Sequence, residues 1–144
     1  MTAHLLDVNV LIALIDPTHV HHEKAHAWFT MSGKQDWLSS PTTESGVVRI
    51  VSHPRYSNAA RTPSVVIESL RSLRSVGQHR FAPDSISVLD PEHIVGDALL
   101  SSGQVTDSYL IALAANERAA LATFDRRIVS TAVRDPRAKV VQIP

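Results

Sequence analysis

The chain has 144 residues, of which 44% are hydrophobic and 19% charged, and its formal net charge is zero. This length and composition predict one soluble globular domain over residues 1–144, and the balanced charge gives no global sign of nucleic-acid binding. The absence of cysteine excludes disulfide frameworks and thiolate metal sites. Because the longest apolar run is too short to span a bilayer and no signal peptide is evident, we expect a cytoplasmic protein without membrane contact.

Short apolar segments alternate with segments of helical spacing along the whole chain. In chain order, the patterns predict a strand at 4–7, a helix at 8–15, a helix at 19–31, a strand at 36–39, a helix at 41–52, a loop at 53–62, a helix at 63–77, a strand at 86–89, a weak helix at 92–100, a helix at 105–118, a strand at 121–124, a short helix at 126–132 and a strand at 140–143. Pro41 and Pro63 suit first helical turns, and Val20, Ala25, Trp28 and Phe29 are candidate core residues. This alternation predicts a three-layer α/β/α sandwich with a mainly parallel sheet, whose strand order is left open.

Four acidic residues stand where a strand or helix is expected to begin or end. Asp7 and Asp125 each close an apolar strand, so both are expected at the crevice beyond the carboxyl ends of the strands. Glu44 and Asp107 each share one helix side with apolar residues near the helix start. Taken alone, each acid also fits the role of a helix-capping or turn residue. The joint pattern favours convergence of the four carboxylates in space.

Converging carboxylates raise one another's pKa unless a cation compensates their charge. A site made only of oxygen ligands suits Mg²⁺, or Mn²⁺, which keep several bound waters. Such an ion can activate water and neutralise charge on a phosphate. We therefore expect a metal-dependent phosphodiesterase in which Asp7, Glu44, Asp107 and Asp125 are both the catalytic residues and the metal ligands.

Arginines and histidines provide further candidates. Arg49, one turn after Glu44, and Arg126, directly after Asp125, are candidate substrate-binding residues, although a surface role for each stays open. An excess of arginine between residues 49 and 80 suits either a phosphate backbone or a solvated helix face. The four histidines between residues 19 and 26 are interpreted as solvated or capping residues, because a zinc site needs a further ligand and a supporting shell.

At the acidic positions the chain resembles a PIN domain, specifically the VapC-type toxins of bacterial toxin–antitoxin pairs, with a mycobacterial-like pattern. The segments DVNVLIAL, TTESGVVRI, TDSYLIALA and ATFDRRI are similar to the four motifs of that family, in the correct order over nearly the whole chain. The resemblance implies that Asn9 and Thr123 are supporting residues that orient ligands or water. It also implies a Mg²⁺-dependent endoribonuclease that cuts cellular RNA and inhibits translation, a cognate VapB-type antitoxin and a homodimer.

Two other classes of function stay open. A receiver-like or phosphotransfer domain would also use strand-end aspartates, but none of the lysines of this chain convincingly follows a strand. A non-catalytic nucleic-acid-binding module on the same fold would leave four acids in a groove unexplained.

Overall fold

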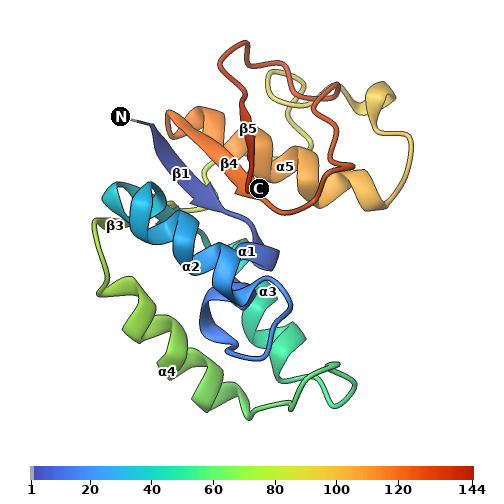
Figure 1. Ribbon diagram of the computed structural model, residues 1–144. Helices are drawn as coiled ribbons and strands as arrows, with labels where there is room; N and C mark the ends of the chain where they lie inside the picture. The colour runs from blue at the N-terminus through green and yellow to red at the C-terminus, as the bar shows by residue number, and fades with distance from the viewer. Residues whose placement is uncertain (1) are drawn as a thin grey trace.

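The computed structural model describes residues 2–144 and contains one parallel sheet covered by helices on both faces (Figure 1). The strands are β1 (Ala3–Leu6), β2 (Trp37–Ser39), β3 (His79–Phe81), β4 (Ala119–Thr123) and β5 (Val140–Gln142). The helices are α1 (Val8–Ile15), α2 (His22–Met31), α3 (Pro41–Val51), α4 (Pro63–Arg74) and α5 (Gly103–Asn116), with short 3₁₀ turns η1 (Gly33–Gln35) and η2 (Gly96–Ala98). The predicted three-layer α/β/α class is confirmed. No helix within residues 2–144 has the length and apolar character needed to cross a membrane.

Two apolar clusters hold the layers together, one on each face of the sheet. Leu6 and Ala122 face the cluster formed with α1, α2, α3 and α4, whereas Leu5 and Leu121 face the cluster formed with α5. Neighbouring residues of one strand therefore enter opposite cores, as expected for a parallel sheet buried on both sides. This explains why β1 and β4 read as continuous apolar runs in the sequence.

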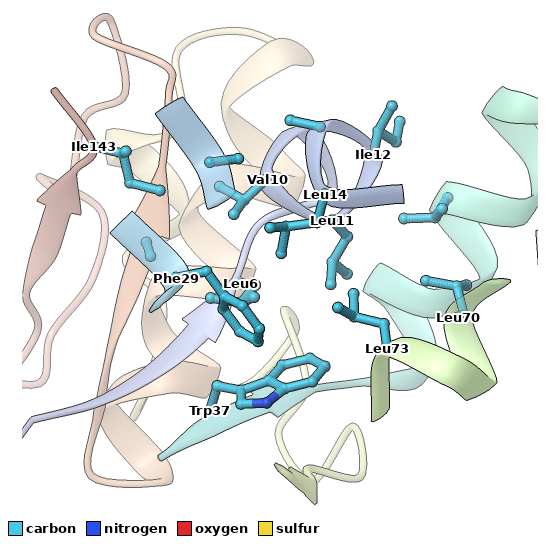
Figure 2. Packing of buried hydrophobic residues seen from close by; sticks show 14 of the residues in the cluster. Leu6, Val10, Leu11, Ile12, Leu14, Phe29, Trp37, Leu70, Leu73 and Ile143 are labelled. Carbon is cyan, nitrogen blue, oxygen red and sulfur yellow. The ribbon is translucent and has the colours of Figure 1, made fainter. Parts of the chain in front are cut away.

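Trp37 anchors the larger cluster, shown in Figure 2. Its indole is 1% exposed, meets the ring of Phe29 edge-on at 5.5 Å between centroids, and donates a hydrogen bond from Nε1 to the Val76 carbonyl at 3.0 Å. Leucines from α1 and α4 pack beside it (Figure 2). The apolar burial and the satisfied indole N–H fix β2 against the helices.

The strand order β3-β2-β1-β4-β5 places β1 at the centre of the sheet. The chain first winds outward from β1 through β2 to β3, and then returns to place β4 and β5 on the other side of β1. The direction of winding therefore reverses between β1 and β4, where Leu6 pairs with Ala122. In open parallel sheets such a reversal opens a crevice at the carboxyl ends of the two strands, and residues 7 and 123–125 lie there.

The prediction missed one strand and added elements that do not form. The segment His79–Phe81 is the edge strand β3, whereas residues 86–89, predicted as a strand, are mostly in turns. The predicted helices at 92–100 and 126–132 are absent, apart from η2. These segments are instead tied by an isolated antiparallel bridge between Ile94 and Val133, and long-range pairing of this kind leaves no local pattern in the sequence.

Val20 is a second correction, because this predicted core residue is 84% exposed. Helix α2 begins only at His22, so Val20 lies in the preceding turn, outside the helical spacing on which the prediction rested. Ala25 and Phe29, within the helix, are buried as predicted.

Candidate active site

Asp7 is fixed between two neighbouring strands and one helix. It follows β1 and forms the N-cap of α1, with Oδ1 accepting a hydrogen bond from the Val8 amide at 2.7 Å. Its Oδ2 accepts a second bond from the Thr123 hydroxyl at 2.7 Å, and the residue is only 7% exposed. Asp7 is therefore held in one orientation at the reversal point of the sheet, by one local and one long-range bond.

Thr123 connects the other residues at this point. Its Oγ1 donates to Asp7 and accepts hydrogen bonds from Asn9 Nδ2 at 3.1 Å and from the Asp125 amide at 3.0 Å. The side-chain oxygen of Asn9 accepts in turn from the Phe124 amide at 3.2 Å. Asn9 and Thr123 thus join the start of α1 to the end of β4, which is the orienting geometry expected of supporting residues.

Three aspartates share one electrostatic environment in the crevice. Burial raises the pKa of Asp107, and the charges of Asp7 and Asp125 raise it further. Burial also raises the pKa of Asp7, as does Asp125, although the bonds from Thr123 and Val8 oppose the shift. Like charges raise a carboxyl pKa in this way when they lie near one another. Asp7, Asp107 and Asp125 therefore lie within electrostatic reach of one another.

Glu44 is held by residues of β2 and α4. Its Oε2 accepts a hydrogen bond from the Ser39 hydroxyl at 2.5 Å and lies 4.0 Å from Arg74 Nη1. Because the single proton of Ser39 is donated to Glu44, His79 Nε2 must be the donor in its 2.8 Å contact with Ser39 Oγ. Burial, aided by the charge of Arg74, lowers the pKa of His79 to about 4, so its ring is neutral near pH 7. His79 of β3 thus donates to Ser39 of β2, which donates to Glu44, and this pair of hydrogen bonds orients the Glu44 carboxylate.

Local sequence explains why Glu44 stands at this point. Ser40 caps α3, and its side chain and that of Thr43 exchange hydrogen bonds with each other's backbone amides in a capping box. Pro41 occupies the first turn, as predicted. The helix therefore starts immediately after β2 and places Glu44 one turn inside, close to the last strand residue, Ser39.

No three acidic or histidine side chains within residues 2–144 already stand in positions that would let them hold one ion together. The donor chemistry nevertheless fits a hard divalent cation, because the three aspartates offer only oxygen atoms and their charges are uncompensated. Among the histidines, His22 Nδ1 and His26 Nε2 contact the carbonyls of Ala13 and Leu14 at 2.7 and 2.8 Å. These rings are bound to the end of α1, which agrees with the capping role expected for them.

A groove of about 590 Å³ runs between α3 and α4. Val48, Ile67 and Leu70 give it an apolar lining, and Glu44 lies in its wall; three arginines also border it, namely Arg49, Arg71 and Arg74. The structure thus places Arg49, a candidate substrate-binding residue, at a groove that also contains Glu44. The other candidate, Arg126, is exposed directly beside Asp125.

Two further residues, Ser39 and Asp16, are not singled out as site or anchor residues by the sequence patterns described above. Ser39 ends β2 as Asp7 follows β1, so the same strand-end rule would have found it. Asp16 is 2% exposed, and its carboxylate accepts hydrogen bonds from Thr18, Tyr56 and Asn58. Two of these partners, Tyr56 and Asn58, lie 40 and 42 residues away in the chain, and no local pattern in the sequence predicts their contact with Asp16.

Comparisons with known proteins agree with this geometry. Residues 4–134 match the family described as the PIN domain. The chain is 42% identical to Ribonuclease VapC39 of Mycobacterium tuberculosis, over 92% of this chain and 94% of that protein. It is also 42% identical to Ribonuclease VapC44 of the same species, over 90% of each chain.

Two solved structures share the fold at low sequence identity. The first is VapBC2 from Rickettsia felis bound to a DNA fragment from its promoter, with a TM-score of 0.59, 12% identity and coverage of 97% of this chain and 98% of that chain. The second is VapC20 of Mycobacterium tuberculosis, a sarcin–ricin loop cleaving toxin, with a TM-score of 0.55, 9% identity and coverage of 90% and 98%. Taken with the family match and the close ribonuclease relatives, the crevice of aspartates at the β1–β4 reversal identifies this chain as a member of the PIN-domain family.

Proposed function

We propose that the protein is a Mg²⁺-dependent endoribonuclease toxin of a type II toxin–antitoxin pair, which hydrolyses phosphodiester bonds in cellular RNA and so inhibits translation. The observation that carries the proposal is the placement of Asp7 at the reversal point of the sheet, where Thr123 binds both its carboxylate and the Asp125 backbone and where the charges of Asp7 and Asp125 help to raise the pKa of Asp107. The relatives named ribonucleases, at 42% identity over nearly the full chain, support the choice of RNA as substrate.

The residues present fit a divalent cation. Asp7, Asp107 and Asp125 would hold Mg²⁺, or Mn²⁺, and Glu44 would complete the acidic set from the groove side. When bound, such an ion activates water for attack on phosphorus and neutralises charge on the phosphate. Thr123 and Asn9 keep Asp7 and the Asp125 backbone in place, and Ser39 keeps the Glu44 carboxylate oriented.

A phosphotransfer role for Asp7 is the second candidate. Each carboxylate oxygen of Asp7 accepts one hydrogen bond, from Val8 or Thr123, and keeps a second lone pair, so this geometry suits a metal ligand and a phosphoryl acceptor alike. The ribonuclease relatives favour hydrolysis, and formation of a stable aspartyl phosphate by the purified chain would favour phosphotransfer instead. The cleavage assay described below distinguishes a nuclease from a non-catalytic binding module.

The proposal includes a protein partner. The structural neighbour from Rickettsia felis is a VapBC complex on promoter DNA, and by analogy a VapB-type antitoxin would inhibit this chain and act with it in the cytoplasm. We also propose a homodimer as its form in solution. Co-expression with a candidate VapB-type antitoxin, followed by purification and mass measurement, tests both proposals.

The deciding experiment is RNA cleavage by the purified chain in Mg²⁺, in Mn²⁺ and in EDTA. Asp7→Asn and Asp107→Asn should each lower the cleavage rate by about 100-fold or more, because the ion contributes several kcal/mol of stabilisation to the transition state. Asparagine is itself a good N-cap, so Asp7→Asn should still fold. The matched control is Asp135→Asn, whose carboxylate pairs only with nearby Arg137 and whose cleavage rate should be unchanged. Full activity in both crevice variants, or in EDTA, would refute the proposal.

A further inference from the structure

Three aromatic rings form a row along the α2 side of the acidic crevice. The ring of His21 stacks on that of Phe124, with 4.6 Å between centroids and 17° between planes. His19 follows at 5.7 Å from His21, tilted by 45°. All three residues are half-buried. We call this set, His19, His21 and Phe124, the aromatic row.

Backbone and side-chain bonds hold the row in place from both ends. The His21 amide donates to His19 Nδ1 at 3.0 Å, and the His19 amide donates to the Asp16 carbonyl at 3.1 Å. Asp16 is itself buried and fixed by the loop after α3. The histidines therefore sit in an ordered turn between α1 and α2, and their stacking geometry costs little entropy to maintain.

The row adjoins the acids through the chain and through hydrogen bonds. Phe124 lies between Thr123, which binds Asp7, and Asp125. Its amide donates to Asn9, so the backbone that carries the ring also joins the supporting network. Arg126 is exposed one residue beyond Asp125. The end of β4 thus carries three kinds of side chain in succession, namely the aromatic ring of Phe124, the carboxylate of Asp125 and the exposed guanidinium of Arg126.

Core packing accounts for only part of this arrangement. Phe124 packs against the larger apolar cluster, which explains why an aromatic residue stands at this position. That packing does not explain why the imidazole of His21 stacks nearly parallel on the Phe124 ring. His22 and His26, by comparison, use their ring nitrogens to bind carbonyls of α1. His21 instead stacks its ring on Phe124, beside Asp125, and is half-buried. Stacking of bases on aromatic rings is how single-stranded nucleic acids bind without sequence readout.

We propose that the aromatic row is a nucleobase subsite, in which one unpaired base of the RNA stacks on His21 and thereby sets the position of the neighbouring phosphate over the aspartates. This inference rests on the proposed function and adds a substrate contact to it. The exposed Arg126 suits the next phosphate along the strand. Recognition by stacking predicts RNA that is unpaired at the cleavage site, with a preference for the larger purine base at that position.

The test measures binding of a short fluorescein-labelled oligoadenylate by fluorescence anisotropy, in the non-cleaving Asp107→Asn background. His21→Ala should weaken binding by about 5- to 150-fold, the range expected for the loss of one base–aromatic stack. His21→Phe should restore it, because the ring is retained without its nitrogens. The matched control is His93→Ala, a half-buried histidine beside Asp90 in the segment before η2, which should bind as the background does.

An abasic scan separates stacking from a purely structural role. Oligoadenylates with one base removed at successive positions should bind more weakly at one position, and His21→Ala should abolish that dependence. Equal loss of affinity in His21→Ala for intact and abasic RNA, failure of His21→Phe to restore binding, or no effect of His21→Ala would each overturn the subsite. Absence of metal-dependent cleavage by the unsubstituted chain would refute the nuclease instead, and the abasic comparison distinguishes the two failures.

Discussion

Replacing Asp16 with alanine should lower the free energy of unfolding by about 3 kcal/mol. The Asp16 carboxylate is 2% exposed and accepts hydrogen bonds from Tyr56 Oη at 2.5 Å and Asn58 Nδ2 at 2.8 Å. Thr18 donates two further bonds, from its amide at 3.0 Å and its hydroxyl at 2.9 Å. The side chain thus ties the end of α1 to the loop between α3 and α4.

The expected magnitude follows from the two long-range bonds. A hydrogen bond to a charged group contributes about 1.5–3 kcal/mol, and the half-buried Tyr56 and Asn58 recover part of that loss from water. Unfolding entropy of about 2.1 cal/mol/K per residue amounts to roughly 0.3 kcal/mol/K for 144 residues. A loss of about 3 kcal/mol should therefore lower the Tm by about 10 °C.

The effect should also depend on pH. Burial alone would raise the pKa of Asp16, but hydrogen bonds from Tyr56, Asn58 and Thr18 outweigh it and lower the pKa well below its usual range. A depressed folded-state pKa gives stability that is present above the unfolded value, about 3.9, and is lost as pH falls through the folded value. Asp16→Asn should therefore flatten the acid side of the stability curve.

Thermal and urea unfolding, followed by circular dichroism at several pH values, measure both effects. Asp135→Ala is the matched control, because Asp135 also accepts several bonds, but only from Arg137 two residues away. A drop in Tm for Asp16→Ala no larger than that of the control would refute the reasoning, as would an unchanged acid limb in Asp16→Asn.

Three further outcomes are expected. In EDTA, Asp107→Asn should be more stable than the unsubstituted chain at neutral pH, because burial and the neighbouring aspartates raise the pKa of Asp107 and stability is lost as pH rises through that value. Adding Mg²⁺ about 100-fold above its Kd should raise the Tm of the unsubstituted chain by roughly 9 °C and that of Asp107→Asn by less. An equal rise in both proteins would count against the site. Ser39→Ala should lower the free energy of unfolding by about 1–2 kcal/mol and slow RNA cleavage as Glu44 loses its donor, so unchanged cleavage rates would show that this orientation is unimportant. The double variant Arg71→Glu and Arg74→Glu should reduce the slope of log RNA affinity against log salt concentration by about 1.4, the contribution of two phosphate contacts to single-stranded nucleic acid. An unchanged slope would exclude these two arginines of the α3–α4 groove from RNA binding.

The acidic residues show how far local patterns reach. Asp7 and Asp125 were predicted at the crevice because each follows an apolar strand, and Asp107 because it shares a helix side with core residues; all three come together. The same reasoning placed Glu44 correctly in the first turns of a helix, and its role as a metal ligand stays a prediction. Its direction depends on Ser39, on the partner His79 of Ser39 and on Arg74, which come from other elements.

The amino-acid sequence by itself determined the helix starts at Pro41 and Pro63, the buried strands β1 and β4 and the residues at their ends, because caps, prolines and apolar periodicity act over one or two turns of chain. Only the tertiary structure decided the order of the strands, the reversal of winding between β1 and β4, the edge strand β3 and the burial of Asp16. These features arise from contacts between segments distant in the chain, whose free energy depends on the packing of the whole sheet against both helical layers.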